Sequence, residues 1–317
     1  MILVAKKFAY LVVMLIIISA ISFFAVHLAP NSFFASGELN PNITPEATQH
    51  LKELYGLEKP IFEQFINWIS SILQLDFGIS FASGESVKDE ILKRLPITLI
   101  INLISMFFIF IISFYLGIKS ALNQNSRFDK FTTQLSLLSF SMPSFYLALL
   151  LMIFLGVWFP LFPISGLHSS NDLKSYDYFF DTAWHLVLPI CVIVFGGIGS
   201  LVLYIRSLCI EILKSEYVFF AKARGLSKKQ ILRYYILPNL YPPTVTILGL
   251  SLPSVIGGSV ILESIFSIDG MGLLFFQAAL SHDYPVIMGI LIIGSFLTLL
   301  GNIIADLILI RINPSSI

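Results

Sequence analysis

The chain has 317 residues, of which 56% are hydrophobic and only 12% are charged, and its formal net charge is zero. Its mean hydropathy is +0.87. A soluble globular domain carries about 25% charged residues, so this composition excludes an ordinary soluble protein. The zero net charge gives no argument for binding to nucleic acid. We therefore expect a chain that lies largely in lipid.

Six apolar segments are long enough, or nearly so, for a helix that crosses a bilayer, which needs about 20 residues. They are 8–29, 97–118, 132–154, 186–205, 240–261 and 286–310. Pro143 and Pro253 interrupt two of them, and such breaks are tolerated where the freed backbone groups are buried in protein or face a cavity. The first segment could instead be a signal peptide, but it is longer than the roughly 7–15 apolar residues of such a peptide. This length favours an uncleaved helix.

The positive charges indicate the orientation of the chain. With the N-terminus inside, 13 of the 19 Lys and Arg residues lie in cytoplasmic segments. Cytoplasmic loops of membrane proteins carry such an excess of Lys and Arg. We therefore expect an all-α polytopic membrane protein with six transmembrane helices and with both termini in the cytoplasm.

The segment between the first two spans is long and is expected outside. Thr44 followed by Pro45 is typical of a helix start, and Gly56 of a helix end. After Pro60, five apolar residues recur at helical spacing, namely Ile61, Phe65, Trp68, Ile69 and Ile72. This stripe fits a helix that packs on its neighbours or lies at the membrane surface. It also fits a docking platform for an extracytoplasmic partner.

The inside segment 216–239 predicts two short helices joined by a defined corner. Gly225 can adopt the left-handed conformation that ends a helix, and Arg224 would interact favourably with the helix dipole there. Ser227 and Gln230 have the spacing of a capping box. Pro238 is expected to stop the second helix.

Three further residues bear on this corner. Leu226 is placed to pack against Ile231 as a hydrophobic staple. Lys228 and Lys229 stand in a first turn, where the helix dipole disfavours positive charge. Positive-inside topology explains these lysines, and so does an acidic or phosphate-rich partner surface. A capped elbow on the cytoplasmic side is a part through which a motor subunit could move membrane helices.

The segment resembles the coupling motif of binding-protein-dependent ABC permeases, in which a Glu-Ala-Ala stretch and a Gly precede a Leu-Pro ending. Ala221, Gly225 and Leu237-Pro238 stand at the spacing of that motif. At the Glu-Ala positions the chain has Phe219 and Phe220 instead.

The departures point to one branch of that family. Residues 216–225 fit the Glu-Tyr-Val form of the dipeptide/oligopeptide/nickel branch, and Tyr235 replaces the usual Ile. Other stretches resemble the same branch in chain order. They are 56–60, 75–78, 94–98, 143–145, 163–166, 185–189, 263–267, 270–272 and 283–285.

The resemblance implies the type I ABC importer permease fold, with a five-helix core preceded by one extra helix. Residues 1–93 would form the N-terminal helix and periplasmic loop, and 94–310 the transmembrane core with coupling helices at about 214–238. It also implies four kinds of partner: a second homologous permease subunit, two ATP-binding subunits, a periplasmic substrate-binding protein and the lipid bilayer. The location implied is the bacterial inner membrane.

The resemblance assigns the contact with the ATPase to eight residues: Glu216, Ala221, Ala223, Arg224, Gly225, Leu237, Pro238 and Asn239. The chain has no Gly-x-x-x-x-Gly-Lys-Ser/Thr phosphate loop. ATP and Mg are therefore expected in a partner, and no cofactor and no enzymatic activity in this chain.

Polar and small residues in the spans are candidates for the transport pathway. The candidates are Ser251, Pro253, Gly257, Gly258 and Glu263, and close helix packing is the alternative for this stretch. Arg206 and Asp306 could pair or extend separately to the membrane surface. No histidines have the i, i+4 spacing of a metal site, so no metal site is expected. Cys191 and Cys209 are expected to be buried free thiols.

The function predicted from these features is the permease step of an ATP-driven importer of dipeptides or oligopeptides. Import of nickel or a nickel chelate by the same mechanism is the alternative. An ion-coupled secondary transporter fits less well, because we find no pair of corresponding half-repeats. The cargo would be selected largely by the binding protein.

Overall fold

The computed structural model describes residues 2–28, 59–169, 175–257 and 260–312. It is built from helices, with an isolated antiparallel bridge between Ile79 and Ser86. The chain divides into two compact units. Unit 1 comprises residues 1–97 and 270–300, and unit 2 comprises 98–269 and 301–317. The helix start predicted at Thr44 and its end at Gly56 lie outside the described residues.

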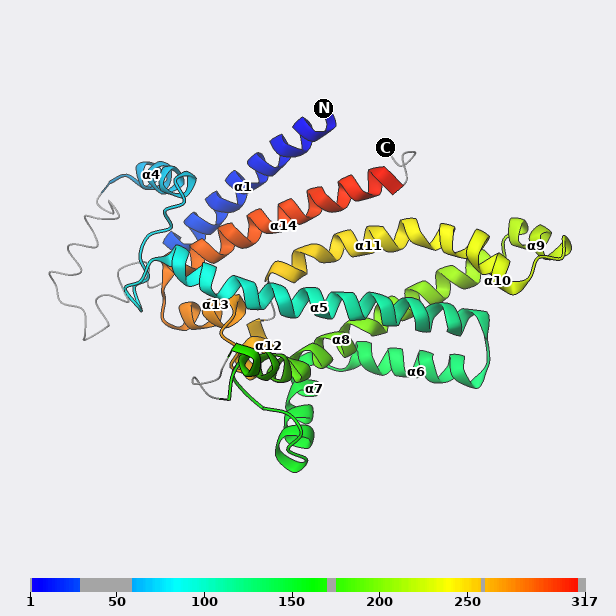
Figure 1. Ribbon diagram of the computed structural model, residues 1–317. Coiled ribbons are helices and arrows are strands. Elements are labelled where there is room, and N and C mark those ends of the chain that lie inside the picture. Colours follow the sequence, from blue (N-terminus) through cyan, green and yellow to red (C-terminus); the bar gives the residue numbers. More distant parts are fainter. Residues whose placement is uncertain (1, 29–58, 170–174, 258–259, 313–317) are drawn as a thin grey trace. The chain divides into compact units, whose positions relative to one another are not determined.

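Unit 1 contains α1 (Ile2–Leu28), α4 (Ile61–Leu73) and α13 (Met271–Leu280) (Figure 1). It also holds the first part of α5 (Val87–Leu122) and most of α14 (Tyr284–Ile312). Its main core joins α5, α13 and α14 through Val87, Ile91, Met271, Leu274, Ala278 and Val286. A side chain at Gly289 would come within 2.7 Å of Val87, so the small residue permits the close approach of α14 to α5.

Helix α4 packs on α1 through the stripe that the sequence predicted. The ring of Phe23 on α1 lies 5.3 Å from that of Phe65 and 5.4 Å from that of Trp68. Ile61 joins the same apolar cluster. The prediction of a helix with one apolar packing stripe is confirmed.

A buried carboxylate organises the turn between α13 and α14. Asp283 accepts hydrogen bonds from the Ser80 hydroxyl at 2.5 Å and from the backbone N–H of Ala82 at 3.1 Å. Because the carboxylate is 2% exposed, these donors replace the water that it loses on burial. Two stretches that resemble the ABC permeases, 75–78 and 283–285, are thus joined through neighbouring residues.

Unit 2 contains the remainder of α5 and the helices α6 (Arg127–Ser141), α7 (Ser144–Leu151) and α8 (Ser175–Leu213). The π-helix η1 (Met152–Trp158) extends α7. Then follow α9 (Glu216–Ala223), α10 (Lys228–Ile231), the π-helix η2 (Leu232–Ile236), α11 (Leu237–Gly257) and α12 (Val260–Ile265).

The two prolines expected to interrupt spans behave differently. At Pro143 the chain bends by 102° between α6 and the pair α7–η1, which confirms the predicted break. The expected break at Pro253 is wrong, because α11 remains helical to Gly257. A proline removes one backbone donor, and neighbouring groups in a membrane protein can compensate for that loss.

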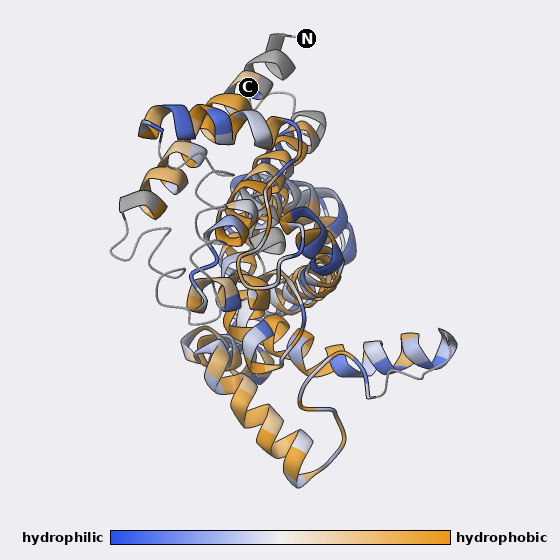
Figure 2. Cartoon of the chain, turned by 90° about the vertical axis from the view of Figure 1, so that its left-hand side faces the viewer, coloured by the Kyte–Doolittle hydropathy of each residue, from blue (hydrophilic) through white to orange (hydrophobic). Residues whose placement is uncertain are grey.

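Among the described residues, four helices are long and apolar enough to cross a membrane: α1, α5, α8 and α14. The bent pair of α6 with α7–η1 would make a fifth span. Helix α11 occupies most of the fifth predicted segment but is not among these four. Figure 2 shows apolar residues over much of the helical surface. The chain is therefore a multi-pass membrane protein.

The two cysteines are both free, as predicted. Cys209 is buried, but the expectation that Cys191 is also buried is wrong, since Cys191 is exposed on α8. A thiol on a membrane helix can face the lipid without a free-energy cost, because lipid tails are as apolar as a protein core. The burial of an apolar side chain is therefore harder to predict in lipid than in a soluble protein.

Candidate functional site

The elbow, defined here as residues 215–240, is the segment that the sequence singled out. Its first helix, α9, begins after Ser215 with Glu216 in the first turn, where a negative charge is favoured by the helix dipole. Val218 and Ala221 are buried, at 0% and 2% exposure. One face of α9 therefore lies against the rest of unit 2.

The corner of the elbow has the predicted left-handed glycine. Gly225 has φ of +80°. Its N–H donates to the carbonyl of Lys222 at 2.9 Å, and the N–H of Leu226 donates to the carbonyl of Ala221 at 3.2 Å. These two bonds form a Schellman motif. A Cβ at Gly225 would meet nothing within 4 Å, so the backbone conformation, and not space, is what requires glycine.

The second half of the corner is fixed by the predicted capping box. The Ser227 hydroxyl accepts from the N–H of Gln230, and the Gln230 side chain accepts from the N–H of Ser227 at 2.8 Å. Leu226 packs in the same apolar cluster as Ile231. These contacts satisfy backbone donors at the helix start, which no bond within the helix could satisfy.

The prediction that Pro238 stops the second helix is wrong. Helix α10 has only four residues, and the chain stays helical through η2 into α11, where Pro238 is the second residue. Proline is tolerated near a helix start, and the wider π turn before it reduces the clash of the ring with the preceding carbonyls. Next to it, the Asn239 amide donates to the carbonyl of Tyr235 at 2.6 Å. From Lys228 onward, the second half of the elbow and α11 thus form one continuous helical rod.

A buried apolar cluster attaches the elbow to three long helices. Its members are Ala121 on α5, Cys209 and Ile212 on α8, Val218, Ala221, Ile231 and Ile236 on the elbow, and Leu240 on α11. In addition, the rings of Tyr217 and Tyr235 stack at 6.3 Å across the elbow. A displacement of the elbow would therefore be transmitted to α5, α8 and α11, because packed side chains are not readily compressed.

The tip of the elbow is exposed and carries aromatic and basic side chains. Phe219 and Phe220, which depart from the general ABC permease motif, are 67% and 60% exposed. The exposed basic residues are Lys222, Arg224, Lys228 and Lys229. Large exposed aromatics rimmed by charge are typical of a surface that binds another protein.

A largely buried ion pair joins α6 and α8. Arg206 donates from Nε to one oxygen of Asp129 at 2.6 Å and from Nη2 to the other at 2.8 Å. Ser120 and the backbone N–H of Asn125 also donate to this carboxylate. The sequence left open whether Arg206 pairs with Asp306 or extends separately to the membrane surface, and the structure shows neither, because its partner is Asp129 on α6. The sequence analysis missed Asp129 as this partner. Its position in the first turn of a helix with Ser126 as the N-cap could have marked it as a residue with a structural role.

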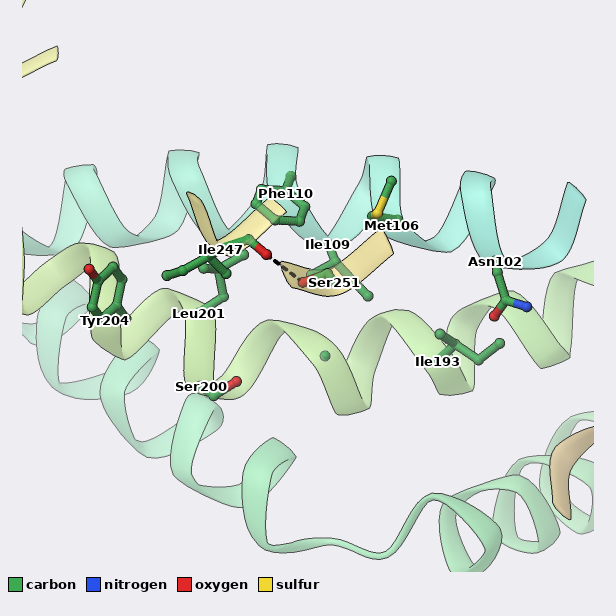
Figure 3. Close-up of a pocket in the computed structure, with 11 residues that line it drawn as sticks. Asn102, Met106, Ile109, Phe110, Ile193, Ser200, Leu201, Tyr204, Ile247 and Ser251 are labelled. Carbon is green, nitrogen blue, oxygen red and sulfur yellow. Dashed lines mark hydrogen bonds between the residues drawn. The ribbon is translucent and has the colours of Figure 1, made fainter. Parts of the chain in front are cut away.

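A cavity of about 500 Å³ lies between α5, α8 and α11 (Figure 3). Most of its wall is apolar, with Met106, Ile109 and Phe110 on α5 and Ile193, Leu201 and Ile247 on the other two helices. Four polar side chains also line it: Asn102, Ser200, Tyr204 and Ser251. The lining residues carry no formal charge. The cavity suits a ligand with apolar groups and neutral hydrogen-bonding groups.

The candidate pathway residues have different positions. Ser251 lines the cavity, and its hydroxyl donates to the carbonyl of Ile247 at 2.8 Å. Pro253 and Gly257 belong to α11, but their surroundings lie outside the described side chains, and Gly258 lies outside the described residues. Asn102, Ser200 and Tyr204 were missed by the sequence analysis, since a single polar residue in an apolar helix does not reveal which helices surround it.

Glu263 on α12 is buried, at 4% exposure, and accepts a hydrogen bond from the Thr98 hydroxyl at 3.1 Å. Nearby, the N–H of Gly166 donates to the carbonyl of Phe266 at 2.8 Å. The stretches 94–98, 163–166 and 263–267 therefore come together. This arrangement favours a packing role for Glu263 over contact with cargo.

The described residues contain no group of three or more His, Cys, Asp and Glu side chains placed to hold a metal ion. Two histidines do lie near one carboxylate at the start of α8. The Nδ1 atom of His168 is 3.9 Å from Oδ2 of Asp181, and the Nδ1 atom of His185 is 3.6 Å from Oδ1 of Asp181. The same carboxylate accepts from the N–H and the hydroxyl of Ser169. It therefore ties the preceding loop to α8.

Residues 113–316 match the family described as the binding-protein-dependent transport system inner membrane component, and residues 1–102 match the N-terminal part of such components. The chain belongs to this family. It is thus a permease subunit of an ABC importer in the inner membrane, and it acts with ATP-binding and substrate-binding partners.

Individual relatives agree with this assignment. The oligopeptide transport system permease protein AppB of Bacillus subtilis is 35% identical over 277 residues, which cover 87% of both chains. The metal-staphylopine import system permease protein CntB of Staphylococcus aureus is 30% identical over 314 residues, covering 98% of this chain and 96% of that protein.

A solved structure, the inward-facing MetNI methionine ABC transporter, shares the fold. Its TM-score is 0.56 at 17% identity, and the match covers 70% of this chain and 95% of the other. The expected type I ABC importer permease fold is confirmed. The number of spans and the side of the membrane on which the termini lie remain predictions.

Proposed function

We propose that the chain pairs with a second homologous permease and two ATP-binding subunits to import dipeptides or oligopeptides, delivered by a periplasmic binding protein. The elbow would seat in the ATPase, where ATP and Mg are bound. The residues that couple the elbow to the ATPase would be Glu216, Ala221, Ala223, Arg224, Gly225, Leu237, Pro238 and Asn239. Of these, Ala221 is buried and would act by holding the elbow against the membrane helices. The chain would have six spans and both termini in the cytoplasm.

One observation carries this proposal. The cluster that holds the elbow includes residues of α5, α8 and α11, and the same three helices line the cavity. A movement of the ATPase that displaces the elbow would therefore change the separation of the helices that surround the cavity. Packed elements with two discrete arrangements transmit a change in this way.

The permease itself would act by alternating access and not by chemistry. Phe219 and Phe220 would enter an apolar cleft of the ATPase, and the basic residues at the tip would face acidic groups around it. The ATPase supplies the energy of nucleotide hydrolysis. Movement of the ATPase would displace the elbow. Helix α11 would move with the elbow because the helical rod from Lys228 to Gly257 is continuous, and α8 would move because it packs against the elbow.

Peptide is the preferred cargo because AppB is named as an oligopeptide permease and the cavity is lined by neutral polar and apolar groups. Backbone amides and varied side chains of a peptide match such a lining. A metal chelate is the second candidate, because CntB is named as a metal-staphylopine permease. The chelating molecule would then meet the same neutral groups.

The test of coupling uses Gly225. A β-branched residue is strongly disfavoured at φ of +80°, so Gly225→Val would displace the elbow while the membrane helices stay folded. The assembled transporter in proteoliposomes should still hydrolyse ATP but lose most uptake. Gly225→Asn is the matched control, since Asn tolerates the left-handed conformation, and it should retain uptake. Coupled transport by Gly225→Val would contradict the proposal.

The test of partner contact uses the basic tip. Replacing both Lys228 and Lys229 by Glu should release the ATPase during purification, whereas Lys119→Glu, at an exposed basic position outside the elbow, should not. Retention of the ATPase by the double variant would show that these lysines serve only membrane topology.

The cargo is tested with the substrate-binding protein that works with this permease. ATP-dependent uptake of labelled tripeptides, competed by unlabelled peptides, is expected in proteoliposomes. Uptake of a nickel chelate without peptide competition would favour the second candidate. Uptake without ATP that follows an imposed ion gradient would overturn the ABC mechanism.

A further inference from the structure

We propose that α4 lies in the interface of the bilayer beside α1, with an apolar face in contact with lipid. This inference rests on the membrane location of the chain and is independent of the cargo. It starts from the distribution of residues around α4. At about 100° per residue, the thirteen residues of this helix form three arcs of different character.

The first arc of α4 is the one that contacts α1. It contains Ile61, Phe65 and Trp68, which pack against Phe23 and Val26. These two residues of α1 stand at the end of its apolar window, Ala9–Val26. Helix α4 is therefore held at the level where α1 leaves the apolar part of the membrane.

The second arc adjoins the first and is apolar but uncovered. Phe62, Ile66 and Leu73 are 70%, 64% and 80% exposed. The ring of Phe62 lies 6.2 Å from that of Phe24 on α1, so this arc continues the apolar surface of α1. Helix α1 itself exposes apolar residues such as Ile21, at 64%, as a helix surrounded by lipid does.

The third arc is polar and lies on the other side of the helix. It contains the exposed residues Glu63, Asn67 and Ser70. A helix with one apolar side and one polar side is suited to the boundary between lipid and water. A helix surrounded by water would expose the second arc at a free-energy cost, since contiguous apolar patches are uncommon on soluble surfaces.

The direction of α4 fits this placement. Figure 1 shows α4 nearly end-on beside one end of α1, and Figure 2, turned by 90°, shows it from the side with its blue and orange sides visible. Helix α4 therefore crosses α1 steeply. Because α1 spans the membrane, a helix that crosses it steeply at its end runs along the membrane surface.

The charges of α4 identify the kind of contact. Glu63 is the one charged residue in the helix, and it stands on the polar arc. Attraction to anionic headgroups, which requires Lys or Arg, is therefore absent from this helix. We infer that the contact is with the acyl chains and does not depend on headgroup charge.

The test uses nitroxide labels on the assembled transporter in nanodiscs. Both native cysteines are replaced by Ala, and single cysteines are introduced as Phe62→Cys and Ile66→Cys on the apolar arc, with Asn67→Cys on the polar arc as the matched control. Labels at 62 and 66 should be several-fold more accessible to oxygen than to a water-soluble nickel complex. The label at 67 should have the opposite preference.

The same result is expected in nanodiscs of phosphatidylcholine and of phosphatidylcholine mixed with phosphatidylglycerol. Equal access of the nickel complex to positions 66 and 67 would overturn the proposal, because both would then face water. Exclusion of both reagents from 62 and 66, or a loss of oxygen access when the binding protein is added, would also overturn it. Those outcomes would identify the second arc as a protein-docking face.

Discussion

The interface of α6 with α8 and the elbow belong to the same unit, yet they are held together by different means. At the interface the two backbones approach closely, because a Cβ at Gly199 would come within 2.5 Å of the carbonyl of Ser136. The hydroxyl of Ser139 donates to the carbonyl of Phe195, and the Asp129–Arg206 pair fixes the end of the contact. At the elbow, a left-handed glycine and a capping box shape the chain, and the tip is exposed.

The two regions should therefore respond differently to substitution. The interface depends on contacts between residues far apart in the chain, so a substitution there should lower the stability of the fold. The corner of the elbow is shaped by contacts within a few residues, so a substitution at Gly225 or Ser227 should alter coupling and leave the fold largely intact. Four substitutions test this distinction.

The largest effect is expected from Asp129→Ala. It would leave the guanidinium of Arg206 without its carboxylate in a largely buried position, and removal of one partner from such a pair costs about 3–5 kcal/mol. The free energy of unfolding of the purified transporter, measured in denaturant and detergent, should fall by that amount. An unchanged value would mean that water or another group solvates Arg206.

A smaller loss is expected from Gly199→Ala. The new methyl group would meet backbone atoms of α6 at 2.5 and 2.8 Å, and overpacking of this kind costs about 1–3 kcal/mol. Gly196→Ala is the matched control on the same helix, since its Cβ would meet nothing within 4 Å. That control should be neutral or slightly stabilising in the same unfolding measurement. Equal effects of the two would contradict a close approach of α6 and α8.

At the elbow, Ser227→Ala should have a local effect of about 1 kcal/mol, the usual value of a lost N-cap. Hydrogen exchange of residues 227–231 should become faster while that of α8 stays unchanged. Ser215→Ala is the comparison, because the Ser215 side chain makes no cap hydrogen bond to α9. Faster exchange throughout unit 2 would show that the elbow and the interface unfold together.

The smallest effect is expected at an exposed ion pair, Glu85–Lys93, at 2.9 Å. The hydrogen bond from Lys93 lowers the pKa of the Glu85 carboxyl. The pair therefore stabilises the folded state at pH values above the ordinary pKa of Glu, and this stabilisation is lost as the pH falls through the lowered pKa of Glu85. Glu85→Gln should leave thermal stability at neutral pH unchanged within error, in contrast to Asp129→Ala. A clear loss of thermal stability on this substitution would show that exposed ion pairs stabilise this fold as much as buried ones do.

Features that depend on neighbouring residues were predicted well from the sequence. The left-handed Gly225, the capping box of Ser227 with Gln230 and the stripe on α4 all arise from contacts over a few positions, and the bend at Pro143 arises from one missing donor. The predictions were wrong where the surroundings in the membrane or an adjoining helix outweighed the preference of a single residue. Pro238 and Pro253 did not end their helices, and Cys191 proved to be exposed.

Hydropathy, motif and backbone conformation are properties of short stretches, so the sequence alone predicted that the chain lies in lipid, which family it resembles and how the corner of the elbow is shaped. The folded structure was needed to show that Arg206 pairs with Asp129, 77 positions away, and that Thr98 donates to Glu263, 165 positions away. It also decided that the helices attached to the elbow line the cavity. Periodicity identifies the apolar faces of a helix, but in lipid almost every face is apolar, so the choice of neighbours depends on the packing of all helices together.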